Sequence, residues 1–264
     1  MGKSSPKALI IGAGGMGRWI AKHLWSAYQV WITDSDKSIV NKIGEPFNRR
    51  FTDNPAFGGY ELVVNAVNLS SATSVIMELK EKNYNGTVVD MSSLKQAVNK
   101  EMLGLAGNAV SVHPLFGPGA RKLEGKTVLF VPVKDRENEA KIANLIFGGA
   151  KIIEIDASTH DVLVAHTIQL TQVLSIIANR LMVHDSDLIG TSSRIMRYVE
   201  AASLYNSSQL VGEMLKGNPF SSELFSEIKE VLNELEHGNI NFKEIDNIKE
   251  LYDRLYSAME SGCI

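Results

Sequence analysis

Short apolar runs recur along the first 155 residues, with helix-compatible segments between them. Seven runs rich in β-branched and aliphatic residues predict strands. Several of them are apolar almost throughout, which is typical of strands buried on both faces of a parallel sheet. The alternation of strands and helices predicts an α/β fold built from βαβ units. The predicted strands are residues 7–11, 29–33, 62–67, 87–90, 109–112, 127–131 and 151–155, and helices are predicted at 17–25, 71–82 and 137–147.

The pattern changes after about residue 156, where strand signals end and long helical stretches follow. The first of these stretches, residues 159–182, has too many apolar positions for one narrow stripe, so we expect it to be buried on more than one side. We therefore expect an α/β domain over residues 1–155 and an all-helical domain over residues 156–264. Further helices are predicted at residues 192–205, 207–216, 221–236 and 242–260.

Composition narrows the class of protein. The chain has 264 residues, a net charge of −3 and 44% hydrophobic residues, which is ordinary for a soluble globular protein and gives no reason to expect a nucleic-acid or membrane partner. The single cysteine, Cys263, excludes an intrachain disulfide. No uninterrupted apolar run approaches the roughly 20 residues of a membrane span, so we expect a cytoplasmic protein.

A glycine-rich turn follows the first predicted strand. Gly12, Gly14 and Gly17 have G-x-G-x-x-G spacing at the head of the first predicted helix. In such a turn the first glycine makes the tight bend, the second lets the backbone approach a diphosphate, and the third allows close packing of helix on strand. The helix N-terminus, which includes Gly15 and Met16, would offer N–H groups to the diphosphate.

An acidic residue stands at the matching distance from this turn. Asp34 ends the second predicted strand, 22 positions after Gly12, where a carboxylate accepts hydrogen bonds from ribose hydroxyls. A carboxylate there would repel a 2′-phosphate, which favours NAD over NADP, although Lys37 follows closely. We therefore expect a Rossmann-type NAD-binding domain, and a simple turn role for Asp34 stays open.

Two later segments carry candidate chemistry. "VVDMSSLK" places Asp90, Ser93 and Lys95 after a strand, and "SVHPLFGPGA" places His113 where the next strand meets a rigid Gly/Pro loop. Ligands of open α/β sheets bind outside the carboxyl ends of the strands. Histidine, with a reference pKa of about 6.5, is suited to accept a proton near neutral pH. His113 is therefore the candidate general base, with an ordinary loop histidine as the alternative.

These elements together resemble the prephenate dehydrogenase family, which includes the arogenate dehydrogenases. The resemblance covers nearly the whole chain, and "HPLFGP" at residues 113–118 is its most specific element. It implies NAD-dependent oxidative decarboxylation of prephenate to 4-hydroxyphenylpyruvate, a step of tyrosine biosynthesis. By this resemblance His113 is the catalytic histidine, and Ser93 hydrogen-bonds near the substrate hydroxyl.

The resemblance also points to substrate contacts in the helical half. "ASTHDVLVAHTIQLTQVL" contains His166 and Gln169, which are three residues apart and would share a helical face. His160 and Asp161, earlier in this segment, are expected to cap the helix instead.

An arginine-containing segment supplies candidates for holding a substrate carboxylate. In "GTSSRIMRYVEAA", Arg197 matches by position the family arginine with this role, and Arg194 one turn away is a second candidate. A guanidinium fork suits a carboxylate because it can donate two parallel hydrogen bonds. A solvated surface role stays open for both.

Several alternatives remain at this point. Arogenate dehydrogenase differs only in the side chain of its substrate, and another two-domain NAD(P)-dependent β-hydroxyacid dehydrogenase would usually carry a lysine on the long helix. A non-catalytic NAD-sensing module is the rival from another class. The apolar character of the helical half favours a homodimer, and no spacing of metal ligands is present.

Overall fold

The computed structural model describes residues 5–183, 190–205, 208–241 and 245–261, so Cys263 lies outside the described residues. The chain divides into two compact units, residues 1–224 and 225–264.

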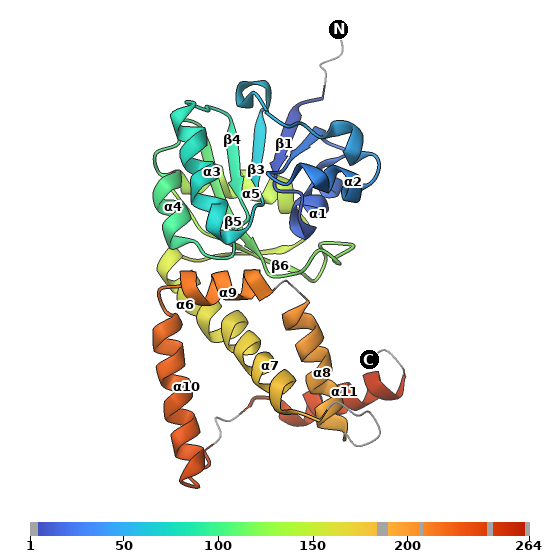
Figure 1. Ribbon diagram of the computed structural model, residues 1–264, viewed down its shortest axis with the longest axis vertical. Coiled ribbons are helices and arrows are strands. Elements are labelled where there is room, and N and C mark those ends of the chain that lie inside the picture. Colours follow the sequence, from blue (N-terminus) through green and yellow to red (C-terminus); the bar gives the residue numbers. More distant parts are fainter. Residues whose placement is uncertain (1–4, 184–189, 206–207, 242–244, 262–264) are drawn as a thin grey trace. The chain divides into compact units, whose positions relative to one another are not determined.

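The first unit contains a seven-stranded sheet with strand order β2-β1-β3-β4-β5-β6-β7 (Figure 1). The apolar runs form strands, most of them buried on both faces, as expected for a sheet covered by helices. The strands lie close to the predicted positions. The strands are β1 (Lys7–Ile11), β2 (Gln29–Thr33), β3 (Leu62–Asn65), β4 (Thr87–Asp90), β5 (Asn108–Pro114), β6 (Thr127–Phe130) and β7 (Lys151–Glu154).

One strand pair departs from the predicted parallel arrangement. β1 to β5 are parallel, but β6 pairs antiparallel with β5, with His113 opposite Leu129. A parallel connection needs a crossover, usually a helix, and the chain between β5 and β6 forms no helix. The chain therefore turns back directly, and the loop after His113 lies against the carboxyl edge of the sheet.

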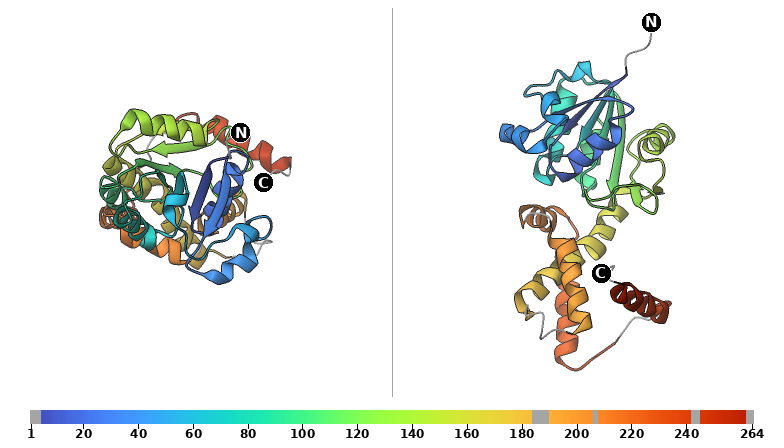
Figure 2. Two further views of the ribbon diagram at one scale, coloured as in Figure 1. Left: turned by 90° about the horizontal axis from the view of Figure 1, so that it is seen from above. Right: turned by 90° about the vertical axis from the view of Figure 1, so that its right-hand side faces the viewer.

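Helices cover both faces of this sheet (Figure 2). On one face α1 (Gly15–Leu24), α2 (Val40–Ile43) and α5 (Arg136–Phe147) contribute to one apolar cluster. On the other face α3 (Leu69–Glu81) and α4 (Gln96–Met102) contribute to a second cluster. The alternating sides of β1 serve both clusters, since Ile10 belongs to the first and Leu9 to the second.

The chain after β7 is helical in its described residues. α6 (Ala157–Val164), a π-helical turn (Ala165–Gln169) and α7 (Leu170–Leu181) form one continuous helix, followed by α8 (Thr191–Leu204), α9 (Ser208–Gly217) and α10 (Ser221–Glu236). Within the first unit α6 packs against α4, and α9 packs against α3. Leu94, Val164 and Met214 form a small apolar cluster there.

The long helix at 157–181 is the one helix among the described residues that is long and apolar enough to cross a membrane. It also carries buried polar side chains, including Gln169, Gln172 and Ser175. Gln169 among them donates a hydrogen bond to the Met214 carbonyl of α9, so this part of the helix is held against another helix of the same unit.

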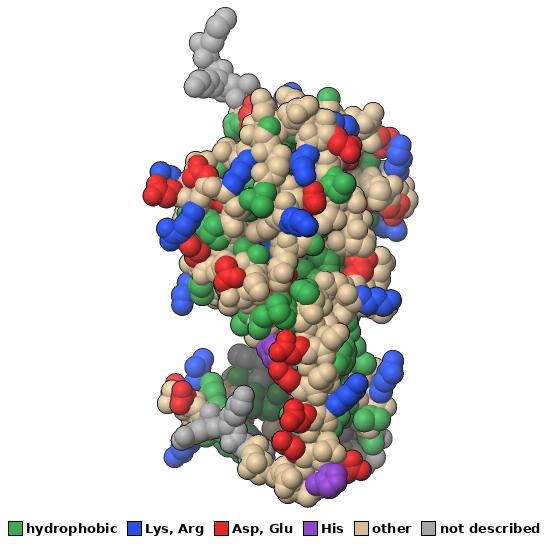
Figure 3. Space-filling model, turned by 90° about the vertical axis from the view of Figure 1, so that its left-hand side faces the viewer, with side chains coloured by type: hydrophobic (Ala, Val, Ile, Leu, Met, Phe, Trp, Pro, Cys, Tyr) green, Lys and Arg blue, Asp and Glu red, His purple; other side chains and the backbone are tan. Residues whose placement is uncertain are grey.

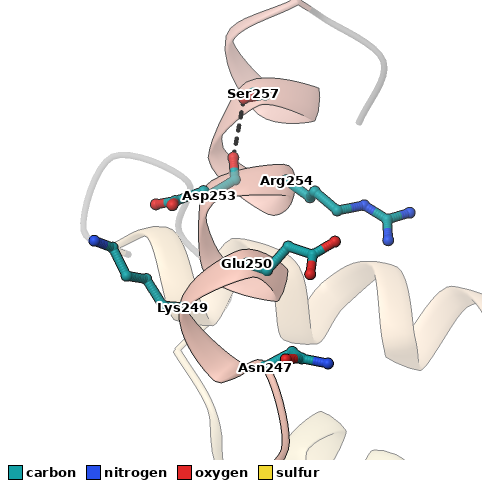
Figure 4. Close-up of a pocket in the computed structure, with 6 residues that line it drawn as sticks. All are labelled: Asn247, Lys249, Glu250, Asp253, Arg254 and Ser257. Atoms are coloured by element: carbon teal, nitrogen blue, oxygen red, sulfur yellow. Dashed lines mark hydrogen bonds between the residues drawn. The ribbon is translucent and has the colours of Figure 1, made fainter.

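The second unit contains most of α10 and all of α11 (Ile248–Glu260). α10 shows a row of acidic side chains on its exposed surface (Figure 3). A shallow polar hollow lies over α11 (Figure 4), and its side chains are those of a solvated helix surface. The lining residues are Asn247, Lys249, Glu250, Asp253, Arg254 and Ser257.

Candidate active site

The candidate residues of the sheet lie at the carboxyl ends of its parallel strands. Gly12 follows β1, Asp90 ends β4 and His113 lies near the end of β5. Because parallel strands end at the same edge, these positions share one side of the sheet. The fold therefore places the glycine-rich turn and the histidine on the same edge.

The three fingerprint glycines have different spatial constraints. Gly12 has a φ of +102°, and a Cβ atom on it would lie 2.5 Å from the carbonyl oxygen of Ala66. A Cβ on Gly17 would overlap the carbonyl oxygen of Gly12, so helix α1 could not pack this closely. A Cβ on Gly14 would meet no atom within 4 Å, so open space borders the turn at that point. A Cβ on Gly15 would come within 3.0 Å of the Pro118 ring in the loop after β5.

Asp34 lies directly beside this turn. Its Oδ2 atom accepts a hydrogen bond of 2.7 Å from the backbone N–H of Ala13, and its Oδ1 atom accepts one of 2.9 Å from Asp36. A carboxylate has about four acceptor positions, so two remain for a ligand. Lys37, the residue that weakened the prediction of NAD, lies 3.4 Å from Asp53 in an exposed ion pair.

The turn fits a dinucleotide. The N-terminus of α1 has no side-chain cap and no acidic residue in its first turn, so no protein carboxylate competes for its N–H groups. A helix N-terminus of this kind binds phosphate through N–H groups and the helix dipole. The N–H groups of Gly14, Gly15 and Met16 would hold the diphosphate, and Asp34 would hold the adenosine ribose.

A buried ion pair between Lys95 and Asp90 lies next to the site. Lys95 Nζ lies 2.7 Å from Asp90 Oδ2, and neither side chain is exposed. Asp90 also accepts hydrogen bonds from Ser92 Oγ (2.5 Å) and Asn65 Nδ2 (2.9 Å). Burial lowers the pKa of Lys95, and the charge of Asp90 opposes this shift. The serine that binds Asp90 is therefore Ser92.

Ser93, the serine singled out by the family resemblance, is half-buried. Its hydroxyl makes no hydrogen bond to any residue that the structure describes, so it is free to meet a ligand. Its role toward a substrate hydroxyl stays a prediction.

His113 contacts a second histidine. Its Nδ1 atom lies 3.0 Å from His160 Nε2, and His160 Nδ1 lies 2.8 Å from Asp161 Oδ1. The Asp161 carboxylate also accepts hydrogen bonds from the backbone N–H groups of Lys95 (2.9 Å) and Gln96 (3.0 Å) at the start of α4. A continuous chain of hydrogen bonds therefore joins β5, α6 and α4.

The expectation that His160 and Asp161 cap their own helix is wrong. Asp156 is the N-cap of α6, because its side chain accepts hydrogen bonds from the N–H groups of Ser158 and Thr159. His160 and Asp161 lie one turn further on and are buried. Asp161 instead satisfies N–H groups of a different helix, α4.

Both imidazoles are held in the neutral form near pH 7. Burial lowers the pKa of His113 well below its usual value, and the nearby His160 and Lys95 add to this shift. Burial also lowers the pKa of His160, although the hydrogen bond to Asp161 opposes the shift. The reference pKa expected for His113 from the sequence is therefore too high.

His166 and Gln169 do not share a helical face. They lie in the π-helical turn, whose wider i→i+5 spacing separates residues three apart. His166 is half-buried and its Nδ1 contacts the carbonyl of Val162 at 3.0 Å. Gln169 is fully buried, with its amide 2.6 Å from the Met214 carbonyl and 3.1 Å from Asn218 Nδ2. Gln169 thus joins helices, and no atom of it is exposed to a substrate.

Arg194 and Arg197 lie on α8, which packs against α7. Both side chains are exposed. Their function as carboxylate ligands stays a prediction.

A basic cleft of about 1420 Å³ opens beside the glycine-rich turn. It is bordered by α1, the loop after β5 and the end of α8. Its lining contains four cationic side chains, namely Arg18, Lys22, Arg121 and Lys122, against one carboxylate, that of Glu124. A concentration of one charge in a concave surface attracts ligands of the opposite charge, so the cleft favours anions.

Three solved structures share this fold over nearly the whole chain. A candidate prephenate dehydrogenase from Corynebacterium glutamicum is 18% identical with a TM-score of 0.70, and the match covers 97% of this chain and 90% of that one. Prephenate dehydrogenase from Aquifex aeolicus, in complex with hydroxyphenyl propionate and NAD+, is 17% identical with a TM-score of 0.65, covering 99% and 97%. Arogenate dehydrogenase from Synechocystis is 17% identical with a TM-score of 0.63, covering 97% and 98%.

No protein-family model and no curated protein matches the chain. The structural comparison establishes the architecture: this chain has the fold of prephenate and arogenate dehydrogenases, a Rossmann-type sheet followed by helices.

Proposed function

We propose that this chain is an NAD-dependent prephenate dehydrogenase, which oxidises and decarboxylates prephenate to 4-hydroxyphenylpyruvate. The observation that carries the proposal is the position of His113, a neutral imidazole on the same sheet edge as a turn that fits a dinucleotide. The shared fold and the "HPLFGP" motif support the same reaction.

His113 performs the proton transfer in this proposal. Oxidation of the ring carbinol requires that its O–H bond break while the hydride leaves the ring carbon. The proton goes to His113, which acts as general base. A nicotinamide dinucleotide held at the glycine-rich turn would supply the hydride acceptor. Loss of CO₂ then restores the aromatic ring, and the resulting phenolate oxygen takes back one proton to give the hydroxyl of the product.

The remaining site residues hold the two ligands. The Ser93 hydroxyl has no hydrogen-bond partner among the described residues. It would therefore donate a hydrogen bond to the substrate near the reacting carbinol. Prephenate carries two carboxylates, and the exposed guanidinium groups of Arg197 and Arg194 suit such groups. His166 stays a candidate contact, whereas buried Gln169 has the structural role described above.

We also propose that the chain works as a homodimer. α7 exposes Leu174, Ile177 and Leu181 within the first unit. In the second unit α11 exposes Ile248 and Leu251. Large apolar side chains exposed in this number on each unit mark surfaces that another protein covers, and a second copy of the chain is the partner we infer.

Arogenate is the second candidate substrate, because it differs from prephenate only in its side chain and undergoes the same ring oxidation. The fold shared with the Synechocystis arogenate dehydrogenase supports retaining it.

Steady-state assays with prephenate and arogenate, each with NAD and NADP, test the proposal. We expect reduced nicotinamide and CO₂ in equal amounts, with prephenate and NAD as the best pair. Absence of turnover with both substrates, in protein that binds NAD, would overturn the proposal and favour an NAD-sensing module.

A further inference from the structure

We infer that His160 and Asp161 are positioning residues that fix the tautomer of His113, so that its Nε2 atom carries the lone pair that accepts the substrate proton. The role of His113 Nε2 as proton acceptor rests on the proposed function. The tautomer itself is a property of the free protein, so it can be measured without any substrate.

The direction of the hydrogen bonds starts from Asp161. Its carboxylate accepts the backbone N–H groups of Lys95 and Gln96, at 2.9 and 3.0 Å, and lies 2.8 Å from His160 Nδ1. An ionised carboxylate only accepts hydrogen bonds. His160 must therefore carry its proton on Nδ1. For His160 Nδ1 to accept the hydrogen bond instead, Asp161 would have to be protonated on Oδ1. That oxygen already accepts the backbone N–H of Lys95.

The state of His160 then determines that of His113. Burial of His160 lowers its pKa, so the ring is neutral and its Nε2 atom is an acceptor. His113 Nδ1, 3.0 Å away, must therefore be the donor. In a neutral imidazole the other nitrogen then has no proton. His113 Nε2 has no hydrogen-bond partner within the described residues, which leaves it available for a substrate hydroxyl.

The same chain supports the charged state that follows proton transfer. When His113 Nε2 takes the proton, the Nδ1–H bond to His160 remains, and the Asp161 carboxylate lies at the far end of the chain. Because Asp161 is also bound to the first N–H groups of α4, its position is fixed by two helices. The hydrogen bond at Nδ1 therefore fixes both the ring orientation of His113 and its tautomer.

The inference can be tested by nitrogen NMR on protein labelled with 15N-histidine. We expect His113 and His160 both to be protonated at Nδ1 in the wild-type protein. His237 is an exposed histidine after α10, and a His237→Gln control should lose the signals of that ring alone and leave those of the two buried rings unchanged. A wild-type His113 protonated at Nε2 would overturn the inference, and this measurement needs no variant of the buried residues.

Two variants extend the test. In Asp161→Asn the side-chain amide can donate a hydrogen bond to His160 Nδ1. This would reverse the tautomers of both imidazoles and leave His113 protonated at Nε2. His160→Phe keeps a ring in the site but removes the partner of His113 Nδ1, so His113 should show both tautomers. We expect kcat to fall at least tenfold in each variant, with the Kd for NAD unchanged. An unaltered tautomer and kcat in a folded variant would overturn the inference.

The outcomes separate this inference from the proposed function. If the wild-type chain oxidises neither prephenate nor arogenate but shows the Nδ1-protonated His113, the function fails and the tautomer assignment stands. If the chain oxidises prephenate with His113 protonated at Nε2, the function stands and the positioning chain is wrong.

Discussion

The Nδ1 atom of His113 lies 3.0 Å from the Nε2 atom of His160, and this contact joins strand β5 to helix α6. The two residues are 47 positions apart in the chain. Both imidazoles are buried, and the contact connects the candidate base through His160 to Asp161.

The buried environment of His113 predicts an unusual pH dependence. A base must be neutral to accept a proton, and burial lowers the pKa of His113, so the neutral form persists to lower pH. We expect the acidic limb of kcat/KM, which reports the free enzyme, to lie below the reference pKa of about 6.5. A pH series of initial rates checks this. A midpoint at or above that value would contradict the environment described for His113.

The buried ion pair predicts a large stability effect. Lys95→Met would leave the Asp90 carboxylate buried without its cation. Removal of one partner of a buried pair costs about 3–5 kcal/mol, so we expect a loss of this size in the free energy of unfolding measured with urea.

A control for this prediction is Lys80→Met, since Lys80 forms a partly exposed pair with Glu101 at 2.7 Å. Exposed pairs contribute about 0–1 kcal/mol, so the control should lose little. Equal losses in the two variants would show that burial does not determine the effect.

Two glycines of the fingerprint should respond differently to alanine. Gly17→Ala places a Cβ onto the Gly12 carbonyl oxygen, so we expect the midpoint of unfolding to fall strongly. Gly14→Ala places a Cβ in open space, so stability should hardly change while NAD affinity falls, because the methyl group occupies the space of the diphosphate. Calorimetry of unfolding and of NAD binding measures both. Unchanged NAD affinity in Gly14→Ala would place the diphosphate elsewhere.

Asp34 should determine the choice between NAD and NADP. Its carboxylate lies against the turn and would repel a 2′-phosphate, and Lys37 is paired with Asp53. We expect Asp34→Ser to weaken NAD binding and to reduce the preference for NAD over NADP, as measured from kcat/KM for each cofactor. Wild-type protein that uses NADP as well as NAD would refute this role.

The sequence predicted the elements whose signal is local. Strands such as β1 and β3 are apolar throughout because both faces are covered, and the glycine spacing of Gly12, Gly14 and Gly17 reflects contacts within one βαβ unit. The direction of β6 was missed because it depends on a connection that lacks a helix, and not on the strand's own residues.

The parts of the site that sequence did not predict depend on distant contacts. His160 and Asp161 resemble a helix cap by residue type, but their partners are on β5 and α4. Ser92, which the sequence did not single out, hydrogen-bonds Asp90, and this contact depends on the backbone direction of the loop. Gln169 lies in a π-helical turn, and the spacing rule for α-helices does not apply to it.

The central claim is that His113 Nε2 accepts the hydroxyl proton, and the kcat of His113→Asn tests it most directly. Asparagine keeps a polar side chain but cannot take up the proton, and loss of a general base costs on the order of 10² to 10⁴ in rate. We predict a fall in kcat of this size with an unchanged Kd for NAD, because the dinucleotide is bound by the turn after β1. A His113→Asn enzyme with near-normal kcat would contradict the account.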